Sequence, residues 1–475
     1  MVDLHLTLDE QSGLARQIYD QIRRAILTGR LPAGTRLPSS RELAQSLGIA
    51  RNTVTAALDH LVAEGYLQAR AGVGTFVSPD ADPAARSAQT SRSSPLTPVP
   101  LWRGETPQVP VLDGEPPAYD FRTGLPDDSR FPYPAWRRHV DVVVRRSSRY
   151  AVYAGPAGPP ALRAAIARHL GVSRGLSVGP DDLLVTDGVQ QALSLLAQVL
   201  VEPGDVVAVE DPGYPPARRA FEFARATVVP VPVDEQGIVV DRLPVRATAV
   251  YVTPAHQFPL GVRMSLARRT ALLEWARAAG AAVIEDDYDT DFRYGARPID
   301  PLHVLDDSGR VVYVGSFSKS MLPALRVGYC LAPPALLDAL LRARFVADWH
   351  GSSLTQLALA GFIDDGHLAA HVRRMRREYE QRRDRIAMLL DEGFRPHLRP
   401  IPTVAGLHLA ARCEGAGHDT VAAWVAACAK QGVAIGSVGD YALGEVEPGV
   451  VIGFGAVPVG RIDEGLRRLR TIIES

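Results

Sequence analysis

Lysine is rare in this chain, and one of its two lysines stands where a lysine can do chemistry. The 475 residues include 52 Lys+Arg side chains, of which only Lys319 and Lys430 are lysines. Lys319 lies in VVYVGSFSKSMLPALRVGY, just after an apolar run and seven residues before Arg326. A lysine at a strand end, near polar groups that orient a cofactor, can form a Schiff base. A solvent-exposed lysine is the weaker interpretation, because nearly all cations here are arginines.

Carboxylates follow another apolar run, thirty-three residues before Lys319. The segment AAVIEDDYD places Asp286 and Tyr288 at the carboxyl end of an expected strand, which is where α/β sheets bind ligands. A carboxylate that faces a pyridine nitrogen keeps it protonated and makes the ring an electron sink. Asp286 fits that role, and Tyr288 could hydrogen-bond a phenolic oxygen. Taken alone, the acidic cluster is equally consistent with a metal site or a solvated loop.

Two further segments suit a flat, phosphorylated ligand. VTDGVQQALSLLAQVL reads as a strand, a glycine turn and a helix start, so the amides of Gly188, Val189 and Gln190 could hold a phosphate. EDPGYPPARRA ends another strand with Tyr214, an aromatic side chain suited to stacking on a flat ring. Each signal is weak alone, but together with the lysine segment they indicate a pyridoxal phosphate site.

A large α/β region must position these residues. From about Tyr119 to Ser475, short runs rich in Val, Ile and Thr alternate with helix-length segments. The runs are 182–186, 205–210, 247–254, 281–287 and 310–316. This pattern predicts a parallel sheet covered by helices on both faces. Nearer the C-terminus, a helix at 368–393 and short strands at 404–410, 432–436 and 450–454 predict a smaller α+β subdomain.

The first 78 residues form a separate block of amphipathic segments. We expect helices over about 12–28, from Ser39 or Ser40 onward, and from near Arg51 to before Gly65, followed by two short strands within 66–77. Helix, helix, turn, helix and β-wing is the winged helix-turn-helix arrangement, an α+β domain. The expected organisation is therefore a multidomain chain with this domain at 1–78, a flexible linker rich in Pro, Ser, Ala and Arg at 79–118, and the α/β region at 119–475.

The charge distribution is compatible with DNA binding by the first block. The whole chain has a formal net charge of -1, which excludes a polyanion binder that works by bulk charge. Residues 16–51, however, hold seven arginines against Asp20 and Glu42, and a local basic stripe supplies the phosphate contacts that dominate affinity. Arg51 and the polar residues after it could meet the major groove. A small protein-binding helical domain is the alternative for this pattern.

The remaining composition excludes several classes of protein. Three cysteines, Cys330, Cys413 and Cys428, are odd in number and widely spaced, so no disulfide framework is expected. The N-terminal residues do not resemble a signal peptide, and no apolar run is long enough to span a membrane. We therefore expect a cytoplasmic protein with no membrane partner.

The first block resembles a known family over nearly its full length. LPSSRELAQSLGIARNTVTAALDHLVAEGYL, followed by GVGTFV, is similar to the GntR-type winged-helix domain. This resemblance implies binding to double-stranded operator DNA, with the wing reaching the minor groove or the backbone. The residues implied to contact DNA are Ser39, Arg41, Arg51, Asn52, Thr53, Gly72, Gly74 and Thr75. For Arg41, a role as a solvated partner of Glu42 or Asp59 remains the alternative.

The second block resembles the fold-type I aminotransferases over roughly 119–475. The resemblance implies that Lys319 carries the cofactor as an internal aldimine, that Asp286 meets the pyridine nitrogen, and that Tyr288 meets O3′. Tyr214 would stack on the ring, and the phosphate would be held by Ser316, Ser318, Arg326, Gly188, Val189 and Gln190. Tyr153 resembles the tyrosine that reaches the cofactor of the neighbouring subunit, which implies a homodimer. No metal is implied.

A GntR-type domain joined to an aminotransferase-like domain resembles the MocR subfamily of bacterial transcriptional regulators, but two positions depart from the aminotransferase pattern. In TPAHQFPLG, Phe258 replaces the Asn beside the cofactor ring, so either His256 or Gln257 contacts the cofactor instead or no residue does. In PGVVIGFGAV, Val451 stands where an Arg clamps the substrate carboxylate. Loss of a bidentate clamp predicts weak amino-acid binding.

Three functions are compatible with these residues. The first is a regulator that senses pyridoxal phosphate, as in MocR-type control of vitamin B6 synthesis, or an amino-acid effector such as γ-aminobutyrate or taurine. The second is an active aminotransferase with an accessory DNA-binding domain. The third is a repressor that has lost its cofactor. Lys319, Asp286 and Arg326 argue against the third, and Val451 argues for at most vestigial transaminase activity.

Overall fold

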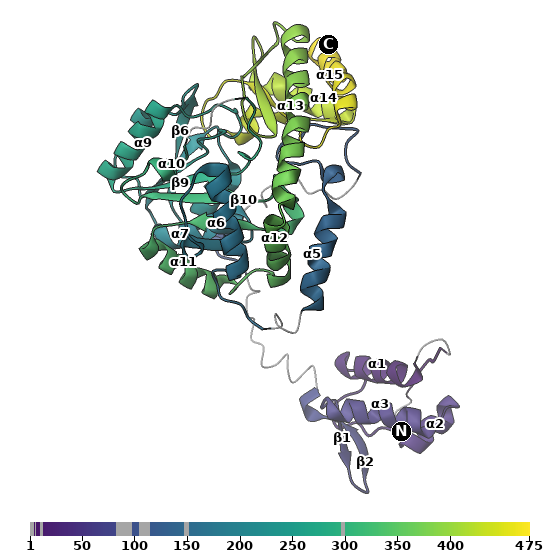
Figure 1. Ribbon diagram of the computed structural model, residues 1–475. Coiled ribbons are helices and arrows are strands. Elements are labelled where there is room, and N and C mark those ends of the chain that lie inside the picture. Colours follow the sequence, from purple (N-terminus) through teal and green to yellow (C-terminus); the bar gives the residue numbers. More distant parts are fainter. Residues whose placement is uncertain are drawn as a thin grey trace. The chain divides into compact units, whose positions relative to one another are not determined.

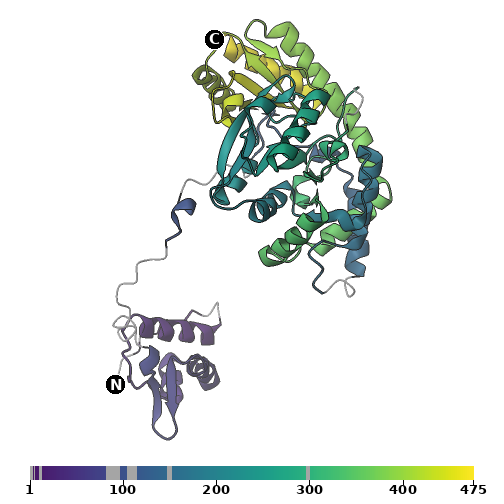
Figure 2. The ribbon, with the colours of Figure 1, turned by 90° about the vertical axis from the view of Figure 1, so that its left-hand side faces the viewer.

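The computed structural model describes residues 4, 6–9, 13–81, 97–103, 115–146, 152–295 and 300–475. Contacts divide the chain into two compact units, residues 1–107 and residues 108–475 (Figure 1, Figure 2). Most of the expected linker, 79–118, lies outside the described residues. No helix in the described part of the chain is long and apolar enough to cross a membrane.

The first unit has the three helices and the hairpin that the sequence predicts. They are α1 (Leu14–Leu27), α2 (Ser40–Leu47), α3 (Arg51–Ala63), β1 (Leu67–Arg70) and β2 (Gly74–Val77). The strands pair antiparallel, with Leu67 opposite Val77. One apolar face of each helix enters a common core that includes Ile18, Leu43 and Leu58. The unit is therefore a winged helix-turn-helix.

Local sequence determines where α2 begins and ends. The Ser39 side chain accepts a hydrogen bond from the Glu42 amide at 3.2 Å, and the Glu42 carboxylate accepts one from the Ser39 amide at 2.8 Å. This reciprocal capping box satisfies backbone donors at the helix start. Gly48 ends the helix at φ 67°, a left-handed conformation that favours glycine.

An eight-stranded sheet forms the centre of the second unit. Its strand order is β4-β11-β10-β9-β8-β5-β6-β7. The bounds are β4 (Leu183–Thr186), β5 (Val206–Asp211), β6 (Thr227–Asp234), β7 (Gly237–Ile238), β8 (Ala249–Val252), β9 (Ala282–Asp287), β10 (Val311–Ser316) and β11 (Gly328–Leu331). The five strands expected from the sequence are β4, β5, β8, β9 and β10. The observed bounds of all five strands differ from the expected ranges by at most two residues at either end.

The expectation of an all-parallel sheet is wrong. β6, β5, β8, β9 and β10 run parallel to one another, but β11 is antiparallel to both β10 and β4, and β7 is antiparallel to β6. A parallel crossover needs a connection that is usually helical. Residues 317–327, between β10 and β11, contain only a short 3-10 turn. The chain therefore reverses direction there.

Helices cover both faces of the sheet, as expected. One face packs α7 (Val189–Leu200), α8 (Pro215–Phe223) and α11 (Pro334–Ala347). The other packs α6 (Pro160–Arg174), α9 (Leu266–Ala279), α10 (Leu302–Leu305) and α12 (Ser353–Asp364), with α5 (Tyr133–Arg145) lying against α12. The polar residues at the ends of these strands are thus enclosed between helices.

The smaller α+β subdomain is also present. It contains α13 (His367–Gly393), α14 (His418–Lys430), α15 (Val459–Ile473) and a four-stranded sheet in the order β12-β13-β16-β15. Those strands are β12 (Leu398–Pro400), β13 (His408–Cys413), β15 (Gly436–Ser437) and β16 (Gly449–Gly453). β14 (Val433–Ala434) pairs with the distant β3 (Tyr119–Asp120). In Figure 1, α13 runs from the end near α12 to the region of α14 and α15.

Candidate functional site

Lys319 reaches a backbone carbonyl from a remote part of the chain. It lies three residues beyond β10, and its Nζ donates a 2.7 Å hydrogen bond to the Gly124 carbonyl. Burial lowers the pKa of Lys319, while Asp289 and Asp286 act in the opposite direction. A lowered pKa increases the fraction of free amine, the form that attacks an aldehyde.

Asp286 is the most distinctive acid of the site. It lies in β9, is 3% exposed, and accepts a 2.6 Å hydrogen bond at Oδ2 from the Tyr251 hydroxyl. Its Oδ1 is buried with no hydrogen-bond partner among the described residues. Burial raises the pKa of Asp286 to about 7, and the bond from Tyr251 acts against this. An unpaired carboxylate oxygen in this position can bind a proton, or it can accept a hydrogen bond from a protonated ring nitrogen.

Two other acids of the cluster, Glu285 and Asp287, are held separately from Asp286. Glu285 accepts hydrogen bonds from the amides of Leu302 and His303, both at 2.9 Å. Asp287 pairs with Arg174 at 2.5 Å. Successive residues of a strand point to opposite faces, which separates Asp286 from both neighbours.

The expected phosphate turn adjoins Arg326. The Arg326 Nη2 donates a 2.7 Å bond to the carbonyl of Asp187. A Cβ on Gly188 would lie 2.9 Å from the same Nη2, so only glycine permits this approach. The helix α7 begins at Val189 with no side chain capping it, and Gln190 is exposed. An uncapped helix start beside a guanidinium is an anion-binding arrangement.

Ser316 and Ser318 lie near the glycine turn at Gly188, because Ser316 pairs with a residue of β11 that contacts this turn. Ser316 ends β10 opposite Gly328, and a Cβ on Gly328 would lie 2.9 Å from the Cα of Gly188. The Ser316 hydroxyl donates to Ser318 Oγ at 2.9 Å and accepts the Ser318 amide at 3.0 Å. The structure therefore brings together all the residues expected to hold phosphate.

Tyr288 and His256 contact each other. The Tyr288 hydroxyl donates to the His256 carbonyl at 3.0 Å and lies 3.1 Å from its Nδ1. That Nδ1 also lies 2.9 Å from Asp289, whereas the His256 Nε2 is buried without a partner among the described residues. Asp289 therefore orients the His256 ring, and the ring supports Tyr288.

Gln257 is occupied by the backbone. Its Nε2 donates to the Pro212 carbonyl at 2.8 Å, and its Oε1 accepts the Leu260 amide at 3.1 Å. These bonds give no support to a contact between Gln257 and a cofactor. Phe258 instead forms edge-to-face contacts with Tyr214, at 5.6 Å between ring centroids, and with other rings of the site. The remaining rings are Tyr288, His408 and Tyr441.

Val451 lies in β16 with no exposed surface, opposite Ala410 and Gly436 on the neighbouring strands. Burial of an aliphatic side chain there gives no charge for a substrate carboxylate. Arg122 has its backbone next to β16, where a Cβ on Gly453 would meet its carbonyl. The guanidinium of Arg122 is already paired with both oxygens of Asp120, at 2.8 and 2.6 Å.

Tyr153 is packed against an aromatic side chain at the surface of the second unit. It is 75% exposed and stacks on Trp349, with centroids 4.5 Å apart and planes 10° apart. Val152, Phe345 and Val346 are exposed apolar side chains as well. A tyrosine so exposed is available to a second copy of the chain.

In the first unit, the expected DNA-contacting residues occupy the starts of α2 and α3 and the wing. Arg51 and Asn52 are exposed, Thr53 is half-buried, and no side chain caps α3. Arg51 Nε donates to Ser40 Oγ at 3.2 Å. Arg41 is exposed. Ser39 serves the capping box of α2, a local role that the sequence also indicated.

The wing is tied to the preceding segment. Gly72 and Gly74 have φ values of 72° and 136°, and a Cβ on Gly74 would lie 2.9 Å from Arg36 Nε. The Thr75 carbonyl accepts the Leu37 amide at 2.9 Å. The turn therefore places Arg36 beside the wing, where an arginine can meet phosphate.

Several residues of the site were missed from the sequence. Tyr251, Gly124 and His408 belong to no motif that was singled out. Asp289 ends the segment AAVIEDDYD, but no role was assigned to it there. The features above fit pyridoxal phosphate: an unpaired buried carboxylate oxygen, an uncapped helix start beside Arg326, and a lysine with a lowered pKa.

Comparisons with known proteins match both units. Residues 14–77 match the profile of the bacterial regulatory proteins of the gntR family, and residues 120–443 match that of the class I and II aminotransferases. The probable rhizopine catabolism regulatory protein MocR of Rhizobium meliloti is 36% identical, covering 98% of this chain and 95% of that protein. The pyridoxine biosynthesis transcriptional regulator PdxR of Corynebacterium glutamicum is 34% identical, covering 96% of this chain and 95% of that protein.

Solved aminotransferases resemble the second unit. The kynurenine aminotransferase of Pyrococcus horikoshii, solved in complex with PMP, has a TM-score of 0.69 and 28% identity. The alignment covers 74% of this chain and 90% of that one. The α-aminoadipate aminotransferase LysN of Thermus thermophilus, solved with a phosphopyridoxyl-leucine compound, has a TM-score of 0.68 and 27% identity over 74% of this chain and 91% of that one.

Proposed function

Because the chain belongs to the MocR-type regulators of the GntR family, which join a winged-helix domain to a class I and II aminotransferase domain, we propose that it regulates transcription in response to pyridoxal 5′-phosphate. One observation carries the proposal. The second unit keeps Lys319 and an open oxygen of Asp286, while the first exposes Arg51 and Asn52 at an uncapped helix start.

The residues of the second unit have distinct parts in holding the ligand. When bound, pyridoxal phosphate supplies an aldehyde that an amine can capture and a ring that withdraws electrons. Lys319 provides the amine, and Asp286 holds a proton at the ring nitrogen. Arg326 and the start of α7 bind the phosphate. Tyr288, whose hydroxyl contacts His256, would hydrogen-bond O3′ of the ligand.

The sensed ligand is pyridoxal phosphate itself, and the regulated process is vitamin B6 synthesis. The relative PdxR is named a regulator of pyridoxine biosynthesis, which supports this assignment. Val451 supports it as well, because an amino-acid effector needs a cation for its carboxylate and this position supplies none. Arg122, the arginine whose backbone lies against β16, is neutralised by Asp120.

The DNA-binding form is a homodimer that reads two half-sites, one with each α3. Tyr153 and Trp349 supply an exposed aromatic pair at the expected contact between subunits. Ligand binding at Lys319 changes the relation between the two winged-helix units, and this couples the ligand to DNA affinity.

A second function, transamination, is favoured by the intact pair of Lys319 and Asp286. The 28% identical kynurenine aminotransferase shares the fold of the second unit. A test separates the two functions. An L-amino acid is added to the protein loaded with pyridoxal phosphate, and absorbance and DNA binding are recorded. If the visible absorbance band is replaced by an ultraviolet band while DNA binding does not change, the enzyme is favoured.

The principal experiment uses Lys319→Ala, with Lys430→Ala as the matched control. Lys430 is the other lysine of the chain, and it is exposed at the end of α14. Full-length protein is titrated with pyridoxal phosphate while absorbance at roughly 400–430 nm, typical of lysine-bound cofactor, and binding to a fluorescent operator fragment are recorded together. The fragment is obtained by selecting bound genomic fragments.

We expect wild type and Lys430→Ala to gain the visible band and to change DNA affinity in parallel. Lys319→Ala should lose the band and the DNA response but keep binding in the absence of ligand. Borohydride reduction and peptide mass mapping should locate the cofactor on Lys319. An unchanged DNA response in Lys319→Ala contradicts the sensor function.

A further inference from the structure

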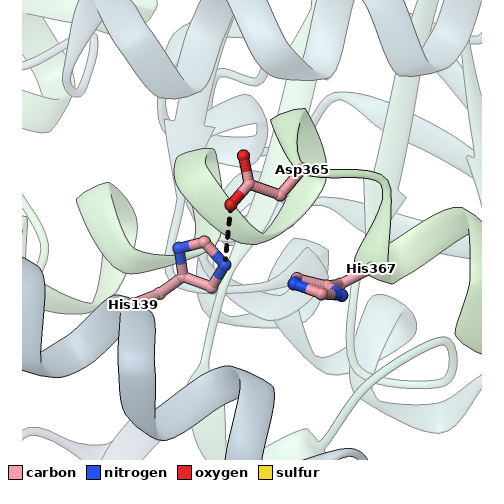
Figure 3. Close-up of side chains that lie close together, drawn as sticks. All are labelled: His139, Asp365 and His367. Carbon is pink, nitrogen blue, oxygen red and sulfur yellow. Dashed lines mark ion pairs between the residues drawn. The ribbon is translucent and has the colours of Figure 1, made fainter.

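Two histidines and an aspartate meet where three helices of the second unit adjoin. His139 lies in α5, Asp365 follows the last residue of α12, and His367 is the first residue of α13. One ligand atom from each lies within 4.8 Å of the other two. Figure 3 shows the His139 ring directed at the Asp365 carboxylate, with the His367 ring beside them.

The spacing suits a shared ion better than a simple pair. His139 Nε2 and Asp365 Oδ2 are 3.5 Å apart, which is long for a hydrogen bond of a charged pair. Ligands at about 2.0–2.1 Å from a tetrahedral ion lie ~3.4 Å from each other. The His139 and His367 rings have centroids 5.5 Å apart, so a small side-chain rotation brings the third ligand into range.

The His139 ring is seated firmly by its surroundings. A Cβ on Gly361 would lie 2.7 Å from His139 Nδ1, so glycine in α12 is what allows the ring to approach. The ring also packs edge-on against Phe362, at 6.0 Å between centroids. Burial lowers the pKa of His139, and this outweighs the opposing effect of Asp365.

Solvent can reach the three groups. The side chain of His139 is 13% exposed and that of Asp365 is 65% exposed. The partial positive charge at the start of α13 and the charge of the nearby Arg138 both disfavour a cation at this position. The negative charge of the Asp365 carboxylate counteracts them. By contrast, the other triplet of potential ligands found among the described residues, His256, Asp289 and His408, is buried, and His408 Nε2 already faces the Pro259 carbonyl at 3.1 Å.

We propose that His139, Asp365 and His367 bind one borderline divalent cation, such as Zn²⁺, Co²⁺ or Ni²⁺, with water completing the coordination. Two imidazole ligands disfavour Mg²⁺ and Ca²⁺, which prefer oxygen. The ion joins α5 to the junction of α12 and α13. A bound ion holds the first residue of α13 in place and so stiffens the start of that helix. From there α13 continues to the smaller subdomain (Figure 1).

The probe is ZnCl₂ added to chelator-treated, full-length protein in competition with a chromophoric chelator. Site variants are His139→Ala, His367→Ala and Asp365→Asn. The control is His60→Ala, which removes an exposed His–carboxylate pair whose Nε2 and Oε1 are 3.6 Å apart and which has no third potential ligand among the described residues. CoCl₂ supplies a second readout, because its visible spectrum reports the coordination geometry.

We expect one Zn²⁺ per chain, at least ~10-fold weaker binding in each site variant, unchanged binding in His60→Ala, and no competition from Mg²⁺. The Co²⁺ band should disappear in the site variants, and Zn²⁺ should raise the Tm of wild type and His60→Ala but not of the site variants. Asp365 is exposed, so Asp365→Asn is decisive if a histidine variant fails to fold. Absence of binding in wild type, or equal binding in wild type and Asp365→Asn, overturns the proposal.

Discussion

Tyr251 donates a 2.6 Å hydrogen bond to Oδ2 of Asp286, while Oδ1 of the same carboxyl is buried and unpaired among the described residues. The two residues lie on adjacent parallel strands, β8 and β9. Tyr251 therefore fixes the orientation of the carboxyl and leaves one oxygen open. This arrangement explains how a group can be buried, reactive and well positioned at once.

Asp286→Asn should change how stability depends on pH in the cofactor-free protein. Burial raises the pKa of Asp286 to about 7, above the value of about 3.9 for an unfolded Asp. Between these values the unfolded chain loses the proton and the native chain keeps it, so the free energy of unfolding falls as pH rises. In wild type this decrease in the free energy of unfolding reaches up to ~4 kcal/mol at pH 7. Asp286→Asn should not show it, because its side chain does not titrate.

Denaturant unfolding of both proteins from acid to neutral pH measures this difference. Glu285, whose pKa burial also raises to about 7, is present in both proteins and cancels. Glu210, whose pKa burial raises to about 7, is coupled to Asp286 and cancels only in part. Parallel stability curves for wild type and Asp286→Asn would show that Asp286 titrates normally.

Gly124→Ala should weaken pyridoxal phosphate binding about tenfold, with little effect on the rest of the fold. Gly124 has φ 78°, and an added Cβ would lie 2.9 Å from Lys319 Nζ. Gly280→Ala is the matched control, because Gly280 has φ 72° and open space at its Cβ. Both variants should lose about 1 kcal/mol of stability from the left-handed backbone. Equal cofactor affinity in the two variants, by absorbance titration, would show that Gly124 does not position Lys319.

The sequence predicted the parts of the site that lie at strand ends. Lys319 and Asp286 directly follow or end apolar runs, and the start of α7 carries its own glycine turn. For the same reason the winged-helix unit was predicted almost completely, since its capping box, turns and apolar faces are local features. Strand alternation and helix periodicity depend on near neighbours, which one sequence displays.

Contacts between distant segments could not be predicted. Gly124 meets Lys319 across 195 positions, and no local pattern in the Gly124 segment signals that contact. The antiparallel direction of β11 could not be predicted either, because the apolar composition of a strand does not determine the direction in which it pairs. Gln257 was one of two candidates for a cofactor contact from its position in a motif, and the bonds of its side chain to the backbone of Pro212 and Leu260 are a further contact that the sequence does not display.

Arg51→Ala should abolish selective operator binding and leave weak nonselective binding. Arg51 is exposed at the first residue of α3, and loss of one base-edge contact costs about 1–3 kcal/mol of discrimination. Arg16→Ala is the control, since Arg16 is an 88% exposed arginine of α1 near Asp20. Anisotropy titrations against operator and scrambled DNA at several salt concentrations separate the effects. Retained discrimination in Arg51→Ala would remove α3 as the reading helix.

Trp349→Ala should weaken self-association of the chain. Trp349 stacks on the exposed Tyr153, and aromatic side chains at the centre of an interface typically contribute ~2 kcal/mol or more. Its loss should raise the dimer dissociation constant at least ~10-fold. The control is Val172→Ser, because Val172 is a 93% exposed apolar residue in α6 outside this pair.

Sedimentation velocity over a range of protein concentrations measures the dissociation constants of the three proteins. If the Tyr153–Trp349 pair lies at the subunit contact, Trp349→Ala should also lower operator affinity at low protein concentration and recover it at high concentration, because only dimers engage both half-sites. A monomeric wild type, or a Trp349→Ala variant that dimerises as tightly as Val172→Ser, would place the subunit contact elsewhere.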